Sequence, residues 1–173
     1  GIDSPDRILS LTAISVPHPQ PFQDTRLDPD SCQFAASMYF NFFVQPNSHD
    51  ILLANDAAQL RLLYDGLPSH HIDDYLSVLS QGDTLKFALH WYRANVGESA
   101  TTVVFPPVDV PTLYVWSDAD TALCEDGARL TANYVTGPYR FEIFENVSHW
   151  VPELAPERLS RLLLNHLKDH PER

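Results

Sequence analysis

The sequence predicts an α/β fold in which a short parallel sheet with flanking helices is interrupted by an all-helical insertion. Residues 8–16 are apolar and rich in β-branched side chains, which predicts a first strand. From residue 112 onwards, strand-like and helix-like segments alternate with short loops, which indicates parallel strands joined by right-handed crossovers. Residues 28–97, between these two parts, have helical patterns, many aromatic side chains and no good strand pattern.

The C-terminal part carries the clearest elements. Residues 112–117 predict an apolar strand, and a helix is expected over roughly 123–136, ended by Gly137 and Pro138. Residues 140–144 predict the next strand. Pro156 suits the first turn of a final helix. The inner face of that helix is expected to carry Leu159, Leu162, Leu163 and Leu167.

The middle of the chain is expected to form a separate helical domain. Helices are predicted around residues 51–63 and 85–92. The first is expected to bury one side made of Ile51, Leu52, Ala58, Leu62 and Leu63. Residues 98–111 contain Pro106, Pro107 and Pro111 and are interpreted as a linker. We therefore place the sheet-containing domain at residues 1–27 and 98–173, and the helical domain at residues 28–97.

Composition excludes several classes of function. The 173 residues are 44 % apolar, which is enough for a core. With 23 acidic against 11 basic residues, the net charge is −12, and this argues against nucleic-acid or anionic membrane partners. The longest apolar runs are far too short to span a membrane. Only Cys32 and Cys124 are present, so we expect reduced thiols and a cytoplasmic location.

An acid and a histidine follow the last two predicted strands. Asp120 closes the run that begins at residue 112, and His149 follows the strand at 140–144. The carboxyl ends of parallel strands meet at one edge of a sheet, so these side chains are expected to converge there with His18, which follows the first strand. A carboxylate that orients a histidine makes a general base, which activates a nucleophile or a water molecule.

Simpler interpretations exist for each of these residues. His149 is alternatively a structural histidine. Asp120 is alternatively the cap of the helix that follows it. Asp118 lies two residues earlier and competes with Asp120 for the role of the acid.

The order of acid and histidine resembles the α/β-hydrolase fold, where nucleophile, acid and histidine follow one another along the chain. Residues 6–21, 112–123 and 140–157 resemble the C-terminal half of that fold, and residues 28–97 resemble its helical cap. In this family the acid comes three residues after a glycine whose place Ser117 takes here, which favours Asp120 over Asp118. Ser148 similarly stands where a glycine is common.

Three segments resemble epoxide hydrolases within that superfamily. Residues 39–46, Tyr-Phe-Asn-Phe-Phe-Val-Gln-Pro, are similar to the cap-entry segment, where a tyrosine precedes a proline by seven residues. Residues 89–95, Leu-His-Trp-Tyr-Arg-Ala-Asn, are similar to the segment that carries the second cap tyrosine. Residues 16–19, Val-Pro-His-Pro, resemble the Pro-His-Pro that follows the sixth strand in this family.

The resemblance implies hydrolysis of a small apolar epoxide in two steps, with no cofactor and no metal ion. An aspartate on a sharp turn would attack the ring and form an ester, while Tyr39 and Tyr92 donate hydrogen bonds to the epoxide oxygen. His149, oriented by Asp120, would then activate water to hydrolyse the ester. The alternatives are a dehalogenase or an ester hydrolase on the same scaffold. By pattern alone, Tyr92 is an ordinary core aromatic of a helix.

No convincing nucleophile precedes Asp120. Residues 97–101, Gly-Glu-Ser-Ala-Thr, begin like a Gly-x-Ser-x-Gly elbow but lack its closing glycine. Asp3 has Pro5 two positions later, where glycine is needed. We expect the nucleophile and the oxyanion loop upstream of Gly1. The strand at 8–16 would then lack an outer neighbour. The chain is therefore expected to need the N-terminal half of the fold as a partner or to form a homo-oligomer, and one alternative is a non-catalytic half.

The sequence also contains one candidate metal-binding cluster. His70 and His71 lie close to Asp73 and Asp74. Adjacent side chains point in different directions on either kind of element, so we interpret this cluster as a solvated loop and not as a metal site.

Overall fold

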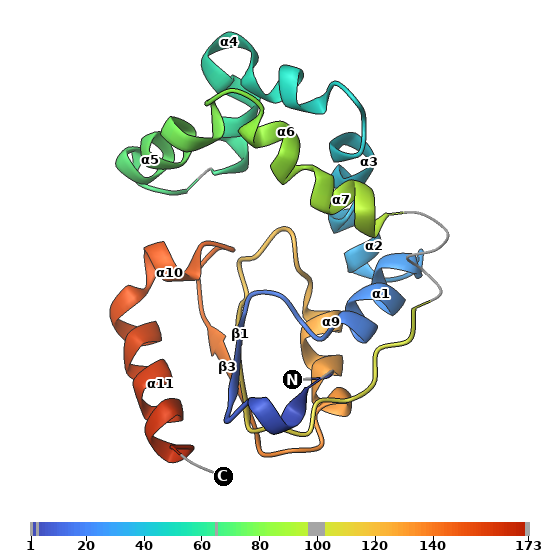
Figure 1. The fold of residues 1–173 in the computed structure, drawn as a ribbon, viewed down its shortest axis with the longest axis vertical. Coiled ribbons are helices and arrows are strands. Elements are labelled where there is room, and N and C mark those ends of the chain that lie inside the picture. Colours follow the sequence, from blue (N-terminus) through green and yellow to red (C-terminus); the bar gives the residue numbers. More distant parts are fainter. Residues whose placement is uncertain (1, 3, 65, 97–102, 172–173) are drawn as a thin grey trace. The chain divides into compact units, whose positions relative to one another are not determined.

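The computed structural model describes residues 2, 4–64, 66–96 and 103–171 (Figure 1). It divides into two compact units: residues 1–37 with 104–173, here called the sheet unit, and residues 38–103, called the helical unit. These boundaries differ from those predicted at residues 28 and 97. The difference arises because helix α2 (Cys32–Ala36), which the sequence places in the helical domain, packs against helices of the sheet unit.

The sheet unit is built on three parallel strands in the order β1-β2-β3. Strand β2 (Thr112–Ser117) pairs with β1 (Leu11–Ile14) on one side and with β3 (Tyr139–Phe144) on the other. Every residue of β2 is buried, as expected for a parallel strand covered on both faces. The predicted α/β class with a short parallel sheet is confirmed.

Helices cover both faces of this sheet. Leu113 and Val115 of β2 pack with residues of α10 (Val151–Leu154) and α11 (Pro156–Asp169). Tyr114 and Trp116 point to the opposite face and pack with Ala128 of α9 (Glu125–Leu130). Figure 1 shows α11 and α9 on opposite sides of the strands. Beside α9 lie α1 (Pro19–Leu27) and α2, and two short 3-10 helices, η1 (Pro5–Arg7) and η2 (Thr131–Tyr134), complete the unit.

Helix α11 begins at Pro156 as predicted, but its buried face differs from the prediction. Leu159 and Leu162 are buried, whereas Leu167 is 57 % exposed, so the prediction was wrong for Leu167. The spacing i, i+3, i+4, i+7 from Leu159 leads to His166 and not to Leu167. His166 is buried, and its Nε2 lies 3.1 Å from the carbonyl oxygen of Leu11. The histidine thus joins the end of α11 to the start of β1.

The helical unit contains five described helices: α3 (Tyr39–Phe43), α4 (Ser48–Leu63), α5 (Ser69–Leu79), α6 (Thr84–Ala88) and α7 (His90–Asn95). Leucines from α4, α5 and α6 form most of its core, together with Phe43. The buried face predicted for residues 51–63 is confirmed for Leu52. It is wrong for Ile51, Ala58, Leu62 and Leu63, which are exposed. Helix α4 is broken over residues 54–57, three of which have positive φ, and this break changes which positions point inward.

The candidate metal cluster lies in a helix and not in a loop. His70, His71, Asp73 and Asp74 all belong to α5, and Asp73 accepts a hydrogen bond of 3.0 Å from the guanidinium of Arg61. Among the described residues, no three histidine, cysteine, aspartate or glutamate side chains lie close enough together to hold a metal ion. Of the helices that the structure describes, none is both long and apolar enough to cross a bilayer.

Candidate active site

The structure brings Asp120 and His149 together. Oδ2 of Asp120 lies 2.8 Å from Nδ1 of His149. The two residues follow β2 and β3, which are neighbours in the sheet, so the carboxyl ends of these strands place them side by side. The side chain of Asp120 is fully buried and that of His149 is 33 % exposed. A carboxylate at Nδ1 holds the proton there and leaves Nε2 as the acceptor, which is the arrangement that a general base requires.

Asp118 has a different partner. Its Oδ1 accepts a hydrogen bond of 2.6 Å from the backbone N–H of Asn146. Asn146 has a φ of 57°, a left-handed conformation that asparagine tolerates better than most other residues. Asp118 therefore connects the loop after β2 to the loop after β3. The geometry favours Asp120 over Asp118 as the acid that orients His149, although its catalytic role stays a prediction.

The alternative that Asp120 caps the following helix is wrong, because α9 begins at Glu125, its N-cap residue is Cys124, and no side chain caps it. Asp120 instead binds the loop before that helix. Its Oδ1 accepts hydrogen bonds from the backbone N–H groups of Ala122, at 2.8 Å, and Leu123, at 3.0 Å. One carboxylate oxygen thus organises the loop after β2 while the other faces His149.

Three further side chains hold the backbone around His149. The hydroxyl of Ser117 donates to the carbonyl of Ser148 at 2.9 Å, and the hydroxyl of Ser15 donates to the carbonyl of His149 at 3.0 Å. Tyr114 donates at 2.9 Å to the carbonyl of Ser15, and burial raises the pKa of this phenol, which keeps it a neutral donor. The side chains at the ends of the strands therefore fix the main chain on both sides of the histidine.

His18 does not take part in the pair, contrary to the expectation that it converges with Asp120 and His149. It caps helix α1: Nδ1 accepts from the N–H of Gln20 at 3.2 Å, so Nε2 is the nitrogen that donates to the carbonyl of Pro106 at 3.1 Å. Its ring also stacks on Tyr134. These partners make His18 a structural histidine.

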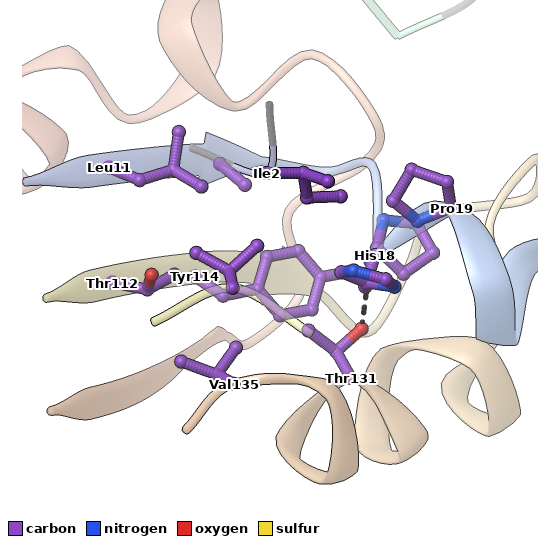
Figure 2. Close-up of a pocket in the computed structure, with 11 residues that line it drawn as sticks. Ile2, Leu11, His18, Pro19, Thr112, Tyr114, Thr131 and Val135 are labelled. Carbon is purple, nitrogen blue, oxygen red and sulfur yellow. Dashed lines mark hydrogen bonds between the residues drawn. The ribbon is translucent and has the colours of Figure 1, made fainter. Parts of the chain in front are cut away.

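A cavity of about 260 Å³ lies beside His18, and Figure 2 shows the side chains that line it. The dashed line marks the hydrogen bond from the His18 backbone N–H to the Thr131 hydroxyl, 3.0 Å long. Most of the lining is apolar, and neither Asp120 nor His149 is part of it. This cavity is therefore separate from the acid–histidine pair.

Protonation of His18 should destabilise the fold. Burial lowers its pKa, opposed by the hydrogen bond to Pro106, whereas the unfolded chain titrates near a pKa of about 6.5. The unfolded state then binds more protons below that pH, so the free energy of unfolding should fall as the pH drops from 7.5 to 5.5. In urea unfolding at both pH values, His18→Asn should show a smaller fall, because asparagine keeps a capping oxygen but does not titrate. An equal fall in the variant and the wild type would contradict this role.

Tyr39 and Tyr92 lie together within the helical unit. Their ring centroids are 6.0 Å apart in an edge-on arrangement, and both rings pack against Phe43. Burial raises the pKa of Tyr92, and a hydrogen bond with Tyr39 acts in the opposite direction. The two phenol groups are thus neighbours, as donors to one substrate oxygen would be. They also contact the core of the helical unit, so the geometry is compatible with both interpretations and their catalytic role stays a prediction.

Arg93 is a residue that the sequence reasoning missed. Its guanidinium donates to the carbonyls of Val44, at 3.4 Å, Gln45, at 3.0 Å, and Lys86, at 3.5 Å. These bonds connect helix α7, which carries Tyr92, to the end of helix α3, which carries Tyr39. An arginine directly after an aromatic pair was the available signal, because long cations often bind carbonyls at helix C-termini. The rejected nucleophile candidates, Asp3 and residues 97–101, lie outside the described residues.

Comparison with solved structures defines the class of fold. The chain has part of the α/β-hydrolase fold: 95 % of it superimposes on 62 % of an epoxide hydrolase from Bacillus megaterium, solved with an inhibitor, with a TM-score of 0.81 and 20 % identity. A metagenomic epoxide hydrolase of the α/β-hydrolase superfamily gives a TM-score of 0.74 at 22 % identity. A putative acyltransferase from Salmonella enterica, at 16 % identity, gives 0.79 over 98 % of this chain and 59 % of that protein.

In sequence, the chain is similar to epoxide hydrolases. It is 27 % identical to mouse Epoxide hydrolase 4 over 98 % of its own length and 50 % of the mouse protein. Its identity to Epoxide hydrolase 3 of Xenopus tropicalis is 28 %, over 95 % of the chain and 47 % of that protein. A scan against models of protein families gave no match. The chain thus spans about half the length of these curated relatives.

Proposed function

We propose that this chain is part of an enzyme that opens small apolar epoxides to diols through a covalent ester intermediate. The observation that carries the proposal is the 2.8 Å contact between Oδ2 of the buried Asp120 and Nδ1 of the partly exposed His149. The neighbouring phenols of Tyr39 and Tyr92 support the epoxide over other substrates. The similarity to epoxide hydrolases over almost the whole chain points to the same chemistry.

The first step forms the ester. A carboxylate oxygen attacks a ring carbon, the carbon–oxygen bond of the epoxide breaks, and negative charge develops on the departing ring oxygen. Tyr39 and Tyr92 donate hydrogen bonds to that oxygen, and one phenol transfers its proton as the charge develops. Phenols suit this role because they stay neutral at pH 7 and still give up a proton to an alkoxide.

The second step uses His149. Its Nε2 takes a proton from water, and the hydroxide adds to the ester carbonyl. The tetrahedral intermediate then collapses, which releases the diol oxygen and leaves the nucleophile as a carboxylic acid. That acid returns a proton to the phenolate formed in the first step, which regenerates both the carboxylate and the phenol. The imidazolium returns its proton to the diol oxygen. Asp120, fully buried beside Nδ1, stabilises the imidazolium while it lasts.

We propose that the attacking carboxylate is supplied from outside these 173 residues, by an N-terminal half of the fold. A second copy of the chain is an alternative partner for the free edge of the sheet, but it adds no nucleophile. In the sheet formed by the described residues, β1 pairs with β2 alone. A parallel strand with one free edge is a ready site for another strand. The curated relatives are about twice as long as this chain, which supports an N-terminal half of the fold as the partner. The chain with its partner is called the completed enzyme below.

The proposal is tested by comparing the chain alone with the completed enzyme. Diol formation from styrene oxide should be undetectable with the chain alone and should appear when a polypeptide with the upstream half of the fold is added. Light scattering should show the isolated chain as an oligomer or an aggregate. A compact, cooperatively folded monomer that hydrolyses the epoxide unaided would contradict the need for a partner.

A second candidate is an ester hydrolase on the same scaffold. The observation that favours it is the superposition on a putative acyltransferase, whose TM-score of 0.79 is close to the 0.81 for the epoxide hydrolase from Bacillus megaterium. The fold therefore does not by itself select a substrate. An acid–histidine pair that activates water serves ester cleavage as well as it serves an ester intermediate. Activity of the completed enzyme on p-nitrophenyl acetate but not on styrene oxide would favour this candidate over the epoxide.

A further inference from the structure

Gln33 of helix α2 connects this helix to the loop after β2 through side-chain hydrogen bonds. Its side chain is fully buried, which is uncommon for glutamine. Nε2 donates to the carbonyl of Ala122 and to the hydroxyl of Ser37, both at 2.8 Å, and Oε1 accepts from the N–H of Cys124 at 2.9 Å. Both donor protons and the acceptor are therefore used, and two of the three bonds reach the loop that contains Asp120.

These bonds act on the same peptide groups that hold Asp120. The peptide group between Ala122 and Leu123 donates its N–H to Oδ1 of Asp120 and accepts at its carbonyl from Gln33. Donation to a carbonyl polarises the N–H on the other side of the same peptide group, so the two hydrogen bonds strengthen each other. Gln33 thus fixes the plane of a peptide group that binds the carboxylate, and it strengthens its donor.

The next peptide group is fixed in a similar way. Its carbonyl, on Leu123, accepts from Nε1 of Trp116 at 2.9 Å, and its N–H, on Cys124, donates to Gln33. Gln33 and Trp116 therefore leave the loop between Ala122 and Cys124 little freedom to rotate. This loop carries both N–H donors to Asp120. By holding the loop, the side chains of Gln33 and Trp116 therefore fix the orientation of the Asp120 carboxylate.

We infer that Gln33 is a positioning residue, which holds the loop so that Asp120 keeps His149 in the Nδ1–H tautomer. The inference rests on the proposed function of that pair as a water-activating base. A buried carboxylate stays charged only where hydrogen-bond donors replace water. When the peptide group at Leu123 turns away, Oδ1 loses a donor, the carboxylate reorients and Nε2 of His149 is more often protonated.

The test measures the ring of His149 by long-range ¹⁵N–¹H NMR on the completed enzyme, in which only this chain carries ¹⁵N, at a pH where the ring is neutral. Gln33→Met keeps the length of the side chain but removes its donor and its acceptor. The ratio of Nδ1–H to Nε2–H tautomers should fall about tenfold, the effect of losing one hydrogen bond that supports a charged group. Ser37→Ala removes only one hydrogen-bond partner of Gln33, so it should lower the tautomer ratio less. This milder variant keeps the test decisive where Gln33→Met does not fold.

Thr25→Val is the matched control. It removes a buried hydroxyl of the same unit that bonds to the carbonyl of Pro21 at 2.7 Å, away from the Asp120 loop, and it should leave the ratio unchanged. A wild-type ratio in folded Gln33→Met, or in Ser37→Ala where Gln33→Met does not fold, would overturn the inference. The measurement needs no substrate, so failure of the epoxide assignment would leave its outcome standing. Absence of the Nδ1–H tautomer in the wild type would overturn the inference together with the pair.

Discussion

Asp120→Asn should reduce epoxide turnover by the completed enzyme by about 10²–10⁴-fold, the range by which a general base accelerates a reaction. The amide oxygen of asparagine takes the place of Oδ1 and accepts from the N–H groups of Ala122 and Leu123. The NH₂ group then faces Nδ1 of His149, which must accept. The proton moves to Nε2, where it blocks the only nitrogen that is able to take a proton from water.

Asp118→Asn is the matched control for this change. Asp118 accepts from the backbone of Asn146, and an asparagine at position 118 keeps that oxygen. Turnover by Asp118→Asn should therefore stay within a few-fold of the wild type. Equal losses in the two variants, measured as kcat on styrene oxide, would mean that Asp120 only shapes its loop.

Replacing Tyr39 and Tyr92 with phenylalanine should abolish epoxide opening and spare ester cleavage. Removing one donor to a developing oxyanion costs about 10²–10³-fold in kcat, and the double variant loses both. The packing should survive, because the two rings meet Phe43 edge-on at 5.1 and 4.8 Å between centroids and phenylalanine keeps these contacts. An ester such as p-nitrophenyl acetate does not need a proton donor to a ring oxygen, so its hydrolysis should continue.

Tyr75→Phe is the control for these substitutions. Tyr75 lies on α5 of the same unit and stacks on Tyr64. Its variant should keep epoxide turnover near the wild-type value. Undiminished epoxide turnover in the double variant Tyr39→Phe, Tyr92→Phe would overturn the epoxide assignment. Loss of ester cleavage together with epoxide turnover would instead indicate damage to the helical unit.

The sheet and its acid–histidine pair could be predicted because they depend on local patterns. A central parallel strand reads as a continuous apolar run, and that run identified β2. Asp120 and His149 follow two such strands, and the geometry of parallel sheets requires the ends of neighbouring strands to be adjacent. The resemblance to the α/β-hydrolase fold was also needed, because it favoured Asp120 over Asp118 for the contact that the structure shows at 2.8 Å.

The remaining features depend on contacts that the sequence does not display. The break in α4 includes Asn55 and Asp56, which tolerate the left-handed conformation, but no glycine or proline. Its third left-handed residue, Ala57, gives no signal. His166 is buried because the carbonyl of Leu11, 155 positions away, lies beside it. Gln33 has no motif, and its role depends on the loop around Ala122, 89 positions further along. Such long-range polar contacts leave no periodicity to detect.

Mass spectrometry of the His149→Gln variant tests directly the claim that His149 activates the water that cleaves an ester intermediate. The variant of the completed enzyme is mixed with excess styrene oxide, quenched in acid and weighed. We predict that its nucleophile-bearing chain gains the mass of one substrate molecule and keeps it, whereas the wild type forms diol and retains no adduct. Diol formation by the variant at the wild-type rate, or loss of turnover without a retained adduct, would contradict the claim.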